Sequence, residues 1–403
     1  MMNQNQNLVS TTTTTNTTMD SRIWRHLPQP LVDRVLAFLP PPAFFRFRSV
    51  CRRWYSLLFS DSFLESHLRL SPPFSWFAFF LLPSSSSSPT SPLFAFLLDP
   101  ATLSWYRLPL SSLIPPSFSP AASSSGLLCF LSTPAGPKTL LVTNPISNLT
   151  AVLPPTQTPR LYPTVGFAAT DSSISAVVAG DNMISPFAVK NLTSETFHAD
   201  AAAGYYSPYT TQTPLPRLCN LDPSRMVFSH GSFYCMSSSP FAVLVYDAAG
   251  NYWSKVQPPM RRFLRSPSLV ALGTRVALVA AVEKSRLSVP RSVRVWSLQQ
   301  PPRGAGEGGR TWAEVDRMPP DVHEAFCLVE AGGGFECVAH GAVVAFTTRA
   351  AAQHVLLFDS EKKEWKWAPS CPFLSDVASG GIMRGFAYSP RLATPAIGLL
   401  SSS

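Results

Sequence analysis

A short unit recurs along most of this chain, from about residue 74 onward. Each copy has an apolar strand, a turn that contains Asp, Asn or Gly, and a second strand with an aromatic residue and often a proline after it. Clear copies begin at Phe96, Leu141, Val245, Val295 and Leu357, and a weaker one runs from Phe187 to Phe197. A unit repeated at this scale is typical of folds in which one supersecondary element is repeated in space.

The spacing of the copies indicates which repeat fold this is. The closing aromatic residue or its equivalent falls at positions 105, 149, 197, 253, 312 and 365, at intervals of 44, 48, 56, 59 and 53. Kelch-type blades are about 50 residues long, so the sequence predicts an all-β, kelch-like β-propeller. The glycine pairs of a strong kelch repeat are mostly absent, which leaves six or seven blades open. We expect each aromatic to pack against the next blade, and strands near 385–388 and 396–400 to close the ring on the first blade.

Composition agrees with this architecture and sets the domain limits. Only 14% of the 403 residues are charged, 45% are hydrophobic and 40 are proline, which favours short strands joined by turns. Residues 1–19 are mostly Asn, Gln, Ser and Thr without a basic leader, which predicts a disordered tail and no signal peptide. We therefore expect a tail at 1–19, a small all-α module at 20–70 and the propeller at 71–403.

The small module has a helical pattern with more apolar residues than it can bury. Pro30 suits a first helical position, and Leu31, Val35 and Leu39 form a row spaced by four residues beside Val32 and Leu36. Prolines at 40–42 end this helix, and shorter helical stretches rich in Phe and Leu follow. A unit of about 40 residues is marginal alone. The excess apolar surface predicts a partner that covers it.

This stretch resembles the F-box, on the strength of Leu27-Pro28, the spaced Leu31, Val35 and Leu39, the segment 48–54 (RSVCRRW) and Leu57-Leu58. The resemblance implies docking on a Skp-type adaptor, through which cullin and RING subunits are reached. The residues expected to contact the adaptor are Leu27, Pro28, Leu31, Val32, Val35, Leu36, Leu39, Pro40, Val50, Cys51, Trp54 and Leu57. The alternative is a helical cap that packs on the β-domain.

No motif for catalysis, metal binding or cofactor binding is found. The sequence has no Gly-rich phosphate loop, no GxSxG and no HExxH, and its seven histidines are solitary. The seven cysteines are scattered without a CxxC pair, so neither a disulfide framework nor a zinc site is predicted. The longest apolar stretch is too short to span a membrane. We expect a non-catalytic protein without a cofactor or a small-molecule substrate.

Positive charge is concentrated in two segments. Residues 21–70 carry a formal charge of +5 and residues 251–300 carry +8, against +9 for the whole chain, so the remainder is net acidic by four. A basic segment in an otherwise acidic chain favours an acidic or phosphorylated client surface or the DNA backbone, although plain solvation is the commoner reading. The residues assigned to this patch are Arg261, Arg262, Arg265, Lys284, Arg286, Arg291 and Arg294.

Long stretches of the chain resemble one plant family, UNUSUAL FLORAL ORGANS or FIMBRIATA. The resemblance lies in residues 19–65, 176–200, 233–269, 278–300, 334–341 and 385–400, and it fails in low-complexity loops. It implies a nuclear F-box protein that acts with a LEAFY-type transcription factor in floral meristem and organ identity. The basic segment adds DNA as a partner, and we expect that contact only within a ternary complex. The alternative is a conventional degradation receptor for another client, with no role at DNA.

Overall fold

The computed structural model describes residues 22, 26–82, 93–160, 162–181, 192–207, 209, 213–217, 219–221, 224–238, 240–283, 290–299, 310–350, 353–374 and 382–400. The tail predicted at residues 1–19 lies outside the described residues. The chain divides into two compact units, one up to Pro72 and one from Pro73 onward. The sequence predicts the boundary between the helical module and the propeller after residue 70, two residues before the division in the structure.

The N-terminal unit consists of short helices that begin at prolines or polar residues. Its elements are α2 (Gln29–Ala37), α3 (Pro41–Phe47), α4 (Arg52–Ser56), the 3-10 turn η1 (Leu57–Phe59) and α5 (Asp61–Leu70). Proline lies in the first turn of α2 and of α3, where its missing N–H is not needed. The Cys51 thiol accepts a hydrogen bond from the Trp54 backbone N–H and so caps α4. The predicted all-α module is confirmed.

The C-terminal unit contains six antiparallel sheets of four or five strands among the described residues, which are the blades of a propeller. From the innermost strand outward, blade 1 has β27 (Ile382–Tyr388), β1 (Trp76–Leu82), β2 (Phe94–Asp99) and β3 (Ser104–Pro109). Blade 2 has β4 (Phe118–Ser124), β5 (Leu127–Ser132), β7 (Leu140–Asn144) and β8 (Leu149–Val152), and β6 (Gly136–Pro137) pairs with β9 (Pro159–Arg160) beside it. Blade 3 has β10 (Thr164–Ala169), β11 (Ser173–Asp181), β12 (Leu192–Asp200) and β13 (Tyr205–Ser207), with β14 (Thr213–Pro214) also on β12.

The other three blades repeat the same plan. Blade 4 has β15 (Val227–Ser229), β16 (Ser232–Ser237), β17 (Ala242–Asp247) and β18 (Tyr252–Val256). Blade 5 has β19 (Leu264–Leu272), β20 (Arg275–Glu283), β21 (Pro290–Gln299) and β22 (Thr311–Arg317). Blade 6 has β23 (Phe335–His340), β24 (Val343–Thr348), β25 (Val355–Asp359) and β26 (Glu364–Trp367). The predicted propeller is confirmed, and of the six or seven blades left open the structure has six.

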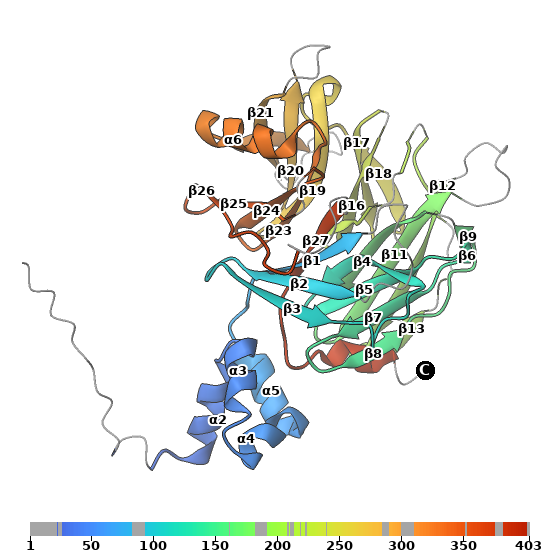
Figure 1. Ribbon diagram of the computed structural model, residues 1–403. Helices are drawn as coiled ribbons and strands as arrows, with labels where there is room; N and C mark the ends of the chain where they lie inside the picture. The colour runs from blue at the N-terminus through green and yellow to red at the C-terminus, as the bar shows by residue number, and fades with distance from the viewer. Residues whose placement is uncertain are drawn as a thin grey trace, which may run out of the picture. The chain divides into compact units, whose positions relative to one another are not determined.

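The ring closes by pairing the last strand with the first. β27 is the innermost strand of blade 1 and runs antiparallel to β1, from the pair Trp76 and Tyr388 to the pair Leu82 and Ile382 (Figure 1). β27 also contacts the inner strands β23 and β4 of its two neighbouring blades. Gly385 is required where these strands meet, because a Cβ there would lie 2.7 Å from the Phe79 ring and 2.8 Å from Val338. The closing strand predicted near 385–388 is confirmed.

The turn between the third and fourth strands of a blade has one recurring chemistry. An Asp or Asn ends the third strand and accepts hydrogen bonds from backbone N–H groups two or three residues on, as Asp99 does from Ala101 and Asp359 does from Glu361 and Lys362. A residue with positive φ follows before the fourth strand, in blade 6 Lys363 at 58°. The members of the set are Asp99, Asn144, Asp200, Asp247 and Asp359. These side chains mimic a backbone turn and leave room for the left-handed residue that a tight hairpin needs.

Blade 3 differs from the sequence prediction by one strand. The expected copy ran from Phe187 to Phe197, with Phe197 as the closing aromatic. Phe187 lies outside the described residues, and Phe197 is on the third strand, β12, with the Asp200 turn after it. The fourth strand is β13, which contains Tyr206. The error arose because an aromatic on a buried third strand has the same spacing signal as one on a fourth strand.

The outer-strand tryptophans contact the preceding blade and not the next one. The Trp253 indole N–H of blade 4 donates to Ser194 Oγ of blade 3 at 2.9 Å, and the Trp312 indole of blade 5 donates to the Gln257 carbonyl, just after blade 4, at 2.9 Å. Trp105 of blade 1 donates to the Pro369 carbonyl, which follows blade 6, at 2.8 Å. The predicted direction was therefore wrong. These bonds satisfy each indole N–H and tie neighbouring blades together at their outer edges.

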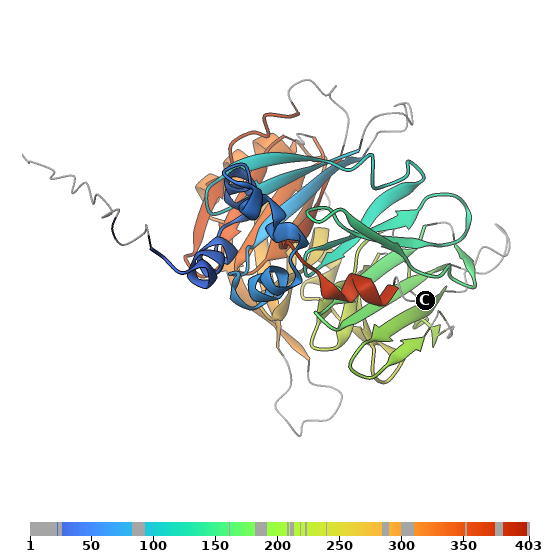
Figure 2. The ribbon, with the colours of Figure 1, turned by 90° about the horizontal axis from the view of Figure 1, so that it is seen from below.

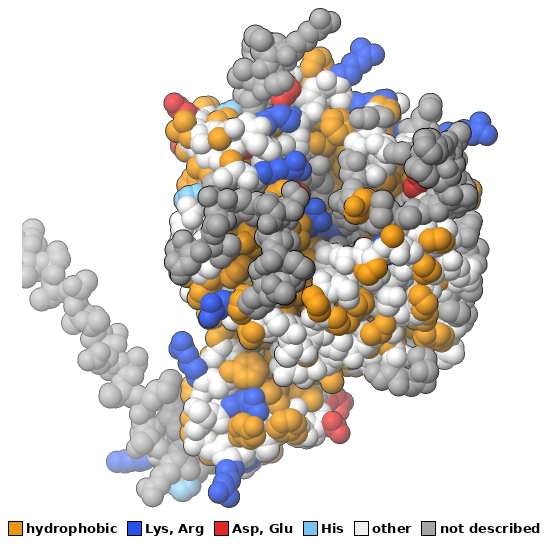
Figure 3. Space-filling view, turned by 45° about the vertical axis from the view of Figure 1, so that its right-hand side comes forward, with side chains coloured by type: hydrophobic (Ala, Val, Ile, Leu, Met, Phe, Trp, Pro, Cys, Tyr) orange, Lys and Arg blue, Asp and Glu red, His pale blue; other side chains and the backbone are white. Residues whose placement is uncertain are grey.

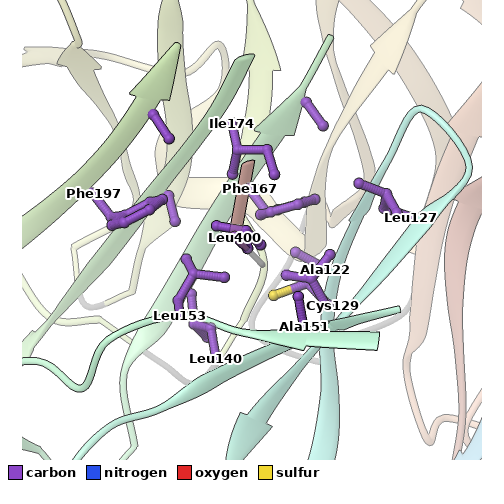
Figure 4. Packing of buried hydrophobic residues seen from close by; sticks show 14 of the residues in the cluster. Ala122, Leu127, Cys129, Leu140, Ala151, Leu153, Phe167, Ile174, Phe197 and Leu400 are labelled. Atoms are coloured by element: carbon purple, nitrogen blue, oxygen red, sulfur yellow. The ribbon is translucent and has the colours of Figure 1, made fainter. Parts of the chain in front are cut away.

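The last described element is a 3-10 helix, η3 (Pro395–Leu400), in place of the strand predicted at 396–400. Ala396, Ile397 and Leu400 are buried in the hydrophobic cluster of blades 2 and 3. Figure 2 shows this terminal segment against those blades, and Figure 4 shows Leu400 among Leu140, Leu153 and Phe167. The ring is already closed by the pairing of β27 with β1, and the segment instead buries three apolar side chains in the cluster of blades 2 and 3.

Candidate functional site

The N-terminal unit has a small core of its own. Leu36, Ala37, Phe44, Leu57 and Phe63 are at most 5% exposed. The rings of Phe44 and Phe63 stack with centroids 5.7 Å apart and join α3 to α5. This core is what the unit can bury by itself, and it takes up two residues, Leu36 and Leu57, that the sequence had assigned to the adaptor.

A larger set of apolar side chains on this unit remains exposed. Leu31 and Val35 of α2 are 44% and 49% exposed, and Val50, in the turn before α4, is 63% exposed. Figure 3 shows hydrophobic side chains beside basic ones on the surface of the N-terminal unit. Leu31 and Val35 are one helical turn apart, so they lie on one face of α2. Solvent contact of this many large apolar groups is typical of a protein-binding surface.

The twelve residues predicted to contact the adaptor therefore separate by burial. The exposed ones are Pro28, Leu31, Val35, Pro40, Val50 and Cys51. The half-buried ones are Leu27, Val32, Leu39 and Trp54, and the buried ones are Leu36 and Leu57. Cys51 has a structural task as well, because its thiol caps α4. Contact with the adaptor stays a prediction for each residue, and it is physically available to the exposed and half-buried ones.

Five exposed aromatics belong to the same surface chemistry and were missed by the motif: Phe38, Phe45, Phe47, Tyr55 and Phe59. The most exposed are Phe38, Tyr55 and Phe59, at 53%, 58% and 74%. The available signal was the number of aromatic residues in so short a segment, which exceeds what four short helices can bury. Motif spacing alone did not single them out.

The arginines of the segment 48–54 organise the unit. Arg48 donates from Nε and Nη2 to the Tyr55 carbonyl at 3.1 and 3.0 Å, and its guanidinium lies 4.5 Å from the centre of the Tyr55 ring. Arg53 reaches back to α2 and pairs with Asp33 at 2.6 Å. The positive charge of this unit is thus partly used to hold its helices in place.

The basic patch predicted in 251–300 is not one surface of unpaired charge. Arg265 makes a two-pronged pair with Glu330 at 2.7 and 2.8 Å, and its Nε lies 3.1 Å from Glu283. Arg294 pairs with Glu314 at 3.1 Å. Both arginines are therefore neutralised by neighbouring carboxylates. Sequence position could not reveal this, since Glu330 and Glu314 are distant in the chain.

The remaining members of the patch lie in different parts of blade 5 and its approach. Arg261 and Arg262 are in η2 (Arg261–Phe263), the connection from blade 4 to blade 5, beside exposed Met260 and Phe263. The backbone of Arg291 is in β21. Lys284 and Arg286 lie outside the described residues. Of the patch members whose side chains are described, Arg261 and Arg262 make no ion pair with a described carboxylate.

Glu330 is the last residue of α6 (Pro320–Glu330), which connects blades 5 and 6. The Glu330 carboxylate accepts hydrogen bonds from several donors. Burial alone would raise the pKa of its carboxyl, but hydrogen bonds from Arg265 and from the Gly334 backbone N–H outweigh burial and hold the pKa below its usual range. The Arg265–Glu330 pair thus fastens the end of α6 to β19 and is structural.

The innermost strands of the six blades line a cavity of about 210 Å³ on the propeller axis. Arg225, just before β15, crosses it and donates from Nη1 to the Gly385 carbonyl at 2.6 Å and from Nη2 to the Cys337 carbonyl. Its guanidinium lies 5.5 Å from the centre of the Phe386 ring. Arg225 therefore connects blade 4 to blades 1 and 6, and its donors are engaged by the protein itself.

The described part of the chain offers neither a metal site nor a reactive thiol in its core. Within those residues, no group of three or more His, Cys, Asp or Glu side chains is placed to hold a metal ion. No helix among them has the length and apolar character that crossing a membrane requires. Burial raises the pKa of the Cys129, Cys235 and Cys337 thiols, which disfavours the reactive thiolate at these positions.

Comparison with known proteins identifies both parts of the chain. The F-box domain family matches residues 24–66. ABERRANT PANICLE ORGANIZATION 1 of Oryza sativa subsp. japonica is 56% identical over 413 residues, covering 96% of this chain and 92% of the rice protein. UNUSUAL FLORAL ORGANS of Arabidopsis thaliana is 47% identical over 400 residues, covering 95% and 88%. An F-box/kelch-repeat protein of Arabidopsis thaliana is 25% identical, covering 94% and 89%.

Proposed function

Because this chain belongs to the UNUSUAL FLORAL ORGANS family of plant F-box proteins, we propose that it recognises a protein client for an SCF-type ubiquitin ligase in floral meristem and floral organ identity. The F-box is the part that binds a Skp-type adaptor, and cullin and RING subunits are reached through that adaptor. The chain is a non-catalytic subunit, as F-box adaptors of this family are.

The observation that carries this proposal is the exposed apolar surface of the F-box unit. Leu31, Val35 and Val50 remain uncovered after the unit has formed its own core. Burial of each such side chain in a partner contributes about 1.5–3 kcal/mol, so a few of them account for tight binding. The alternative from the sequence is a helical cap on the β-domain, and substitution of these side chains with adaptor capture as the readout separates it from docking.

The finer proposal is that the client is a LEAFY-type transcription factor and that the chain is its transcriptional cofactor in the nucleus. The support is the family resemblance across both units and the names of the two relatives, which refer to floral organs and to panicle organization. The propeller supplies the client-binding part, because its connecting loops lie at the ends of six rigid sheets. A fluorescent fusion that is excluded from nuclei would contradict the location.

A reporter assay separates the cofactor from a conventional degradation receptor. A LEAFY-type factor and its promoter reporter are expressed in plant cells with the wild-type chain or with a variant whose F-box surface carries Leu31→Asp and Val35→Asp. A cofactor that acts at DNA retains most of its activation with the variant. A receptor that only destroys its client gives no activation with the wild-type chain, and client protein accumulates with the variant, which would overturn the finer proposal.

A further inference from the structure

A second cavity of about 310 Å³ lies between blades 4 and 5 and gathers two arginines and a histidine. Arg275, Arg310 and His230 line it, with the hydroxyl residues Ser229 and Thr274. Val276 and Leu298 form part of its wall, and its lining contains no carboxylate. We refer to it as the blade 4–5 pocket.

The fold brings these residues to one end of the two blades. Arg275 is the first residue of β20, Arg310 precedes β22, and His230 is in the hairpin between β15 and β16. First-to-second and third-to-fourth hairpins lie at the same end of a propeller blade, because successive strands are antiparallel. Residues far apart in the sequence thus converge on the same pocket.

The hairpins that carry these residues are fastened to each other. Ser229 Oγ donates to the Thr274 carbonyl at 2.8 Å and joins blade 4 to blade 5. The Gly273 N–H donates to the Gly341 carbonyl at 2.8 Å and joins blade 5 to blade 6. A pocket wall held on both sides is preorganised, so little ordering is needed when a ligand binds.

The same bonds orient His230. Its Nδ1 lies 2.9 Å from Ser229 Oγ, and the single hydroxyl hydrogen of Ser229 is already donated to Thr274. Nδ1 must therefore donate to Ser229, which leaves Nε2 as the nitrogen available to a ligand.

Neither arginine of the pocket is neutralised within the described structure. Arg265 and Arg294 of the same blade pair with carboxylates, whereas no ion pair joins Arg275 or Arg310 to a described Asp or Glu. Two exposed guanidinium groups in a concave site with a histidine and hydroxyls match a phosphate group, whose three terminal oxygens accept several charge-assisted hydrogen bonds.

We propose that the blade 4–5 pocket binds a phosphorylated serine or threonine side chain of a protein client; this rests on the proposed client-binding function of the propeller. A peptide fits better than a DNA duplex. Arg261 and Arg262 precede β19 and Arg275 follows it, so they lie at opposite ends of a nine-residue strand, roughly 30 Å apart. A duplex needs a continuous basic surface, and the cations of this pocket are instead concentrated in one cavity.

The test uses the full-length chain and a degenerate peptide library with a fixed central phosphoserine, compared with the same library carrying serine. We expect the phosphoserine library to bind at least about tenfold more tightly, since charge-assisted hydrogen bonds are made only with the phosphate. The double variant Arg275→Gln/Arg310→Gln should bind both libraries alike. Its melting temperature should match the wild type, because neither arginine pairs with a described carboxylate.

The matched control is Arg261→Gln/Arg262→Gln, which removes the same charge at the other end of β19 and should keep the phosphoserine preference. Equal binding of the two libraries to the wild-type chain would overturn the proposal, as would an equally weakened preference in the two double variants. A 20-base-pair duplex whose binding is abolished only in Arg275→Gln/Arg310→Gln would assign the pocket to DNA instead. Capture of a Skp-type adaptor by the same preparations tests the ligase role separately.

Discussion

Tyr388, the last residue of β27, pairs with Trp76, the first residue of β1, so the two ends of the propeller sequence are adjacent strands of one blade. The residues beyond Tyr388 do not take part in this pairing. They include η3, whose apolar side chains are buried against blades 2 and 3. Ring closure and the C-terminal helix are thus two separate contributions to stability.

We predict different results for two C-terminal truncations. Removal of residues 382–403 deletes β27, leaves the inner edge of β1 unpaired and should give an aggregating protein. Removal of residues 390–403 leaves β27 in place and deletes η3 together with the segment before it, and should give a folded but less stable protein, because the buried side chains of η3 and of Leu392 and Thr394 are removed. Solubility and thermal unfolding check this. Equal stability of the wild type and the longer truncation would contradict closure by β27.

A second prediction separates docking from folding in the F-box. Leu31→Asp/Val35→Asp should weaken adaptor binding by roughly 100-fold or more, because two apolar side chains are no longer buried in the partner. Its melting temperature should change little, since both side chains are exposed. The matched control is Leu328→Asp on α6, where the leucine is 79% exposed and adaptor capture should be unchanged.

Leu36→Ala should have the opposite effect to the docking variant, because it should lower the stability of the helical unit. Leu36 is 4% exposed, so its truncation should cost about 2–5 kcal/mol of stability in the helical unit. Calorimetry of the full chain should show this destabilisation.

For the docking variant of the second prediction, adaptor binding at the wild-type level by Leu31→Asp/Val35→Asp would rule out the exposed face of α2 as the docking surface.

A third prediction concerns the Arg265–Glu330 pair and its pH dependence. The pKa of Glu330 is lower in the folded chain than its usual value of 4.5, so its contribution is present above about pH 4.5 and is lost as the pH falls through the folded pKa. Glu330→Gln should therefore destabilise the protein by about 3–5 kcal/mol at pH 7. Urea unfolding should show a smaller difference from the wild type at pH 3.5 than at pH 7.

The double variant Arg265→Met/Glu330→Met is the control for that pair. It removes both charges and should be closer to the wild type than Arg265→Met, which leaves a buried carboxylate without its partner. A difference between Glu330→Gln and the wild type that is equal at both pH values would mean that the carboxylate charge is not what stabilises α6.

A fourth prediction concerns DNA binding by the two arginines of η2, Arg261 and Arg262. Arg261→Glu/Arg262→Glu should weaken a ternary complex with a LEAFY-type factor and DNA, and the slope of log affinity against log salt should fall by about 0.9 for each DNA phosphate that is no longer neutralised. Mobility shifts at two salt concentrations measure both quantities. If the mobility shift and the salt slope are both unchanged, Arg261 and Arg262 are ordinary solvated surface residues that do not contact DNA. Arg265 is left out, because its substitution would break the pair with Glu330.

The sequence by itself determined the helical module, its excess of apolar residues and a propeller, because each depends on local patterns. Helix-period apolar spacing between 27 and 70 and the Asp or Asn turns such as Asp99 and Asp359 act within a few residues. Tertiary structure decided the rest. It set the blade number through the pairing of β27 with β1, and it turned Trp253 and Trp312 toward the preceding blade. It also neutralised Arg265 through Glu330 while bringing Arg275, Arg310 and His230 together, because pairing between distant residues leaves no periodic trace in a single sequence.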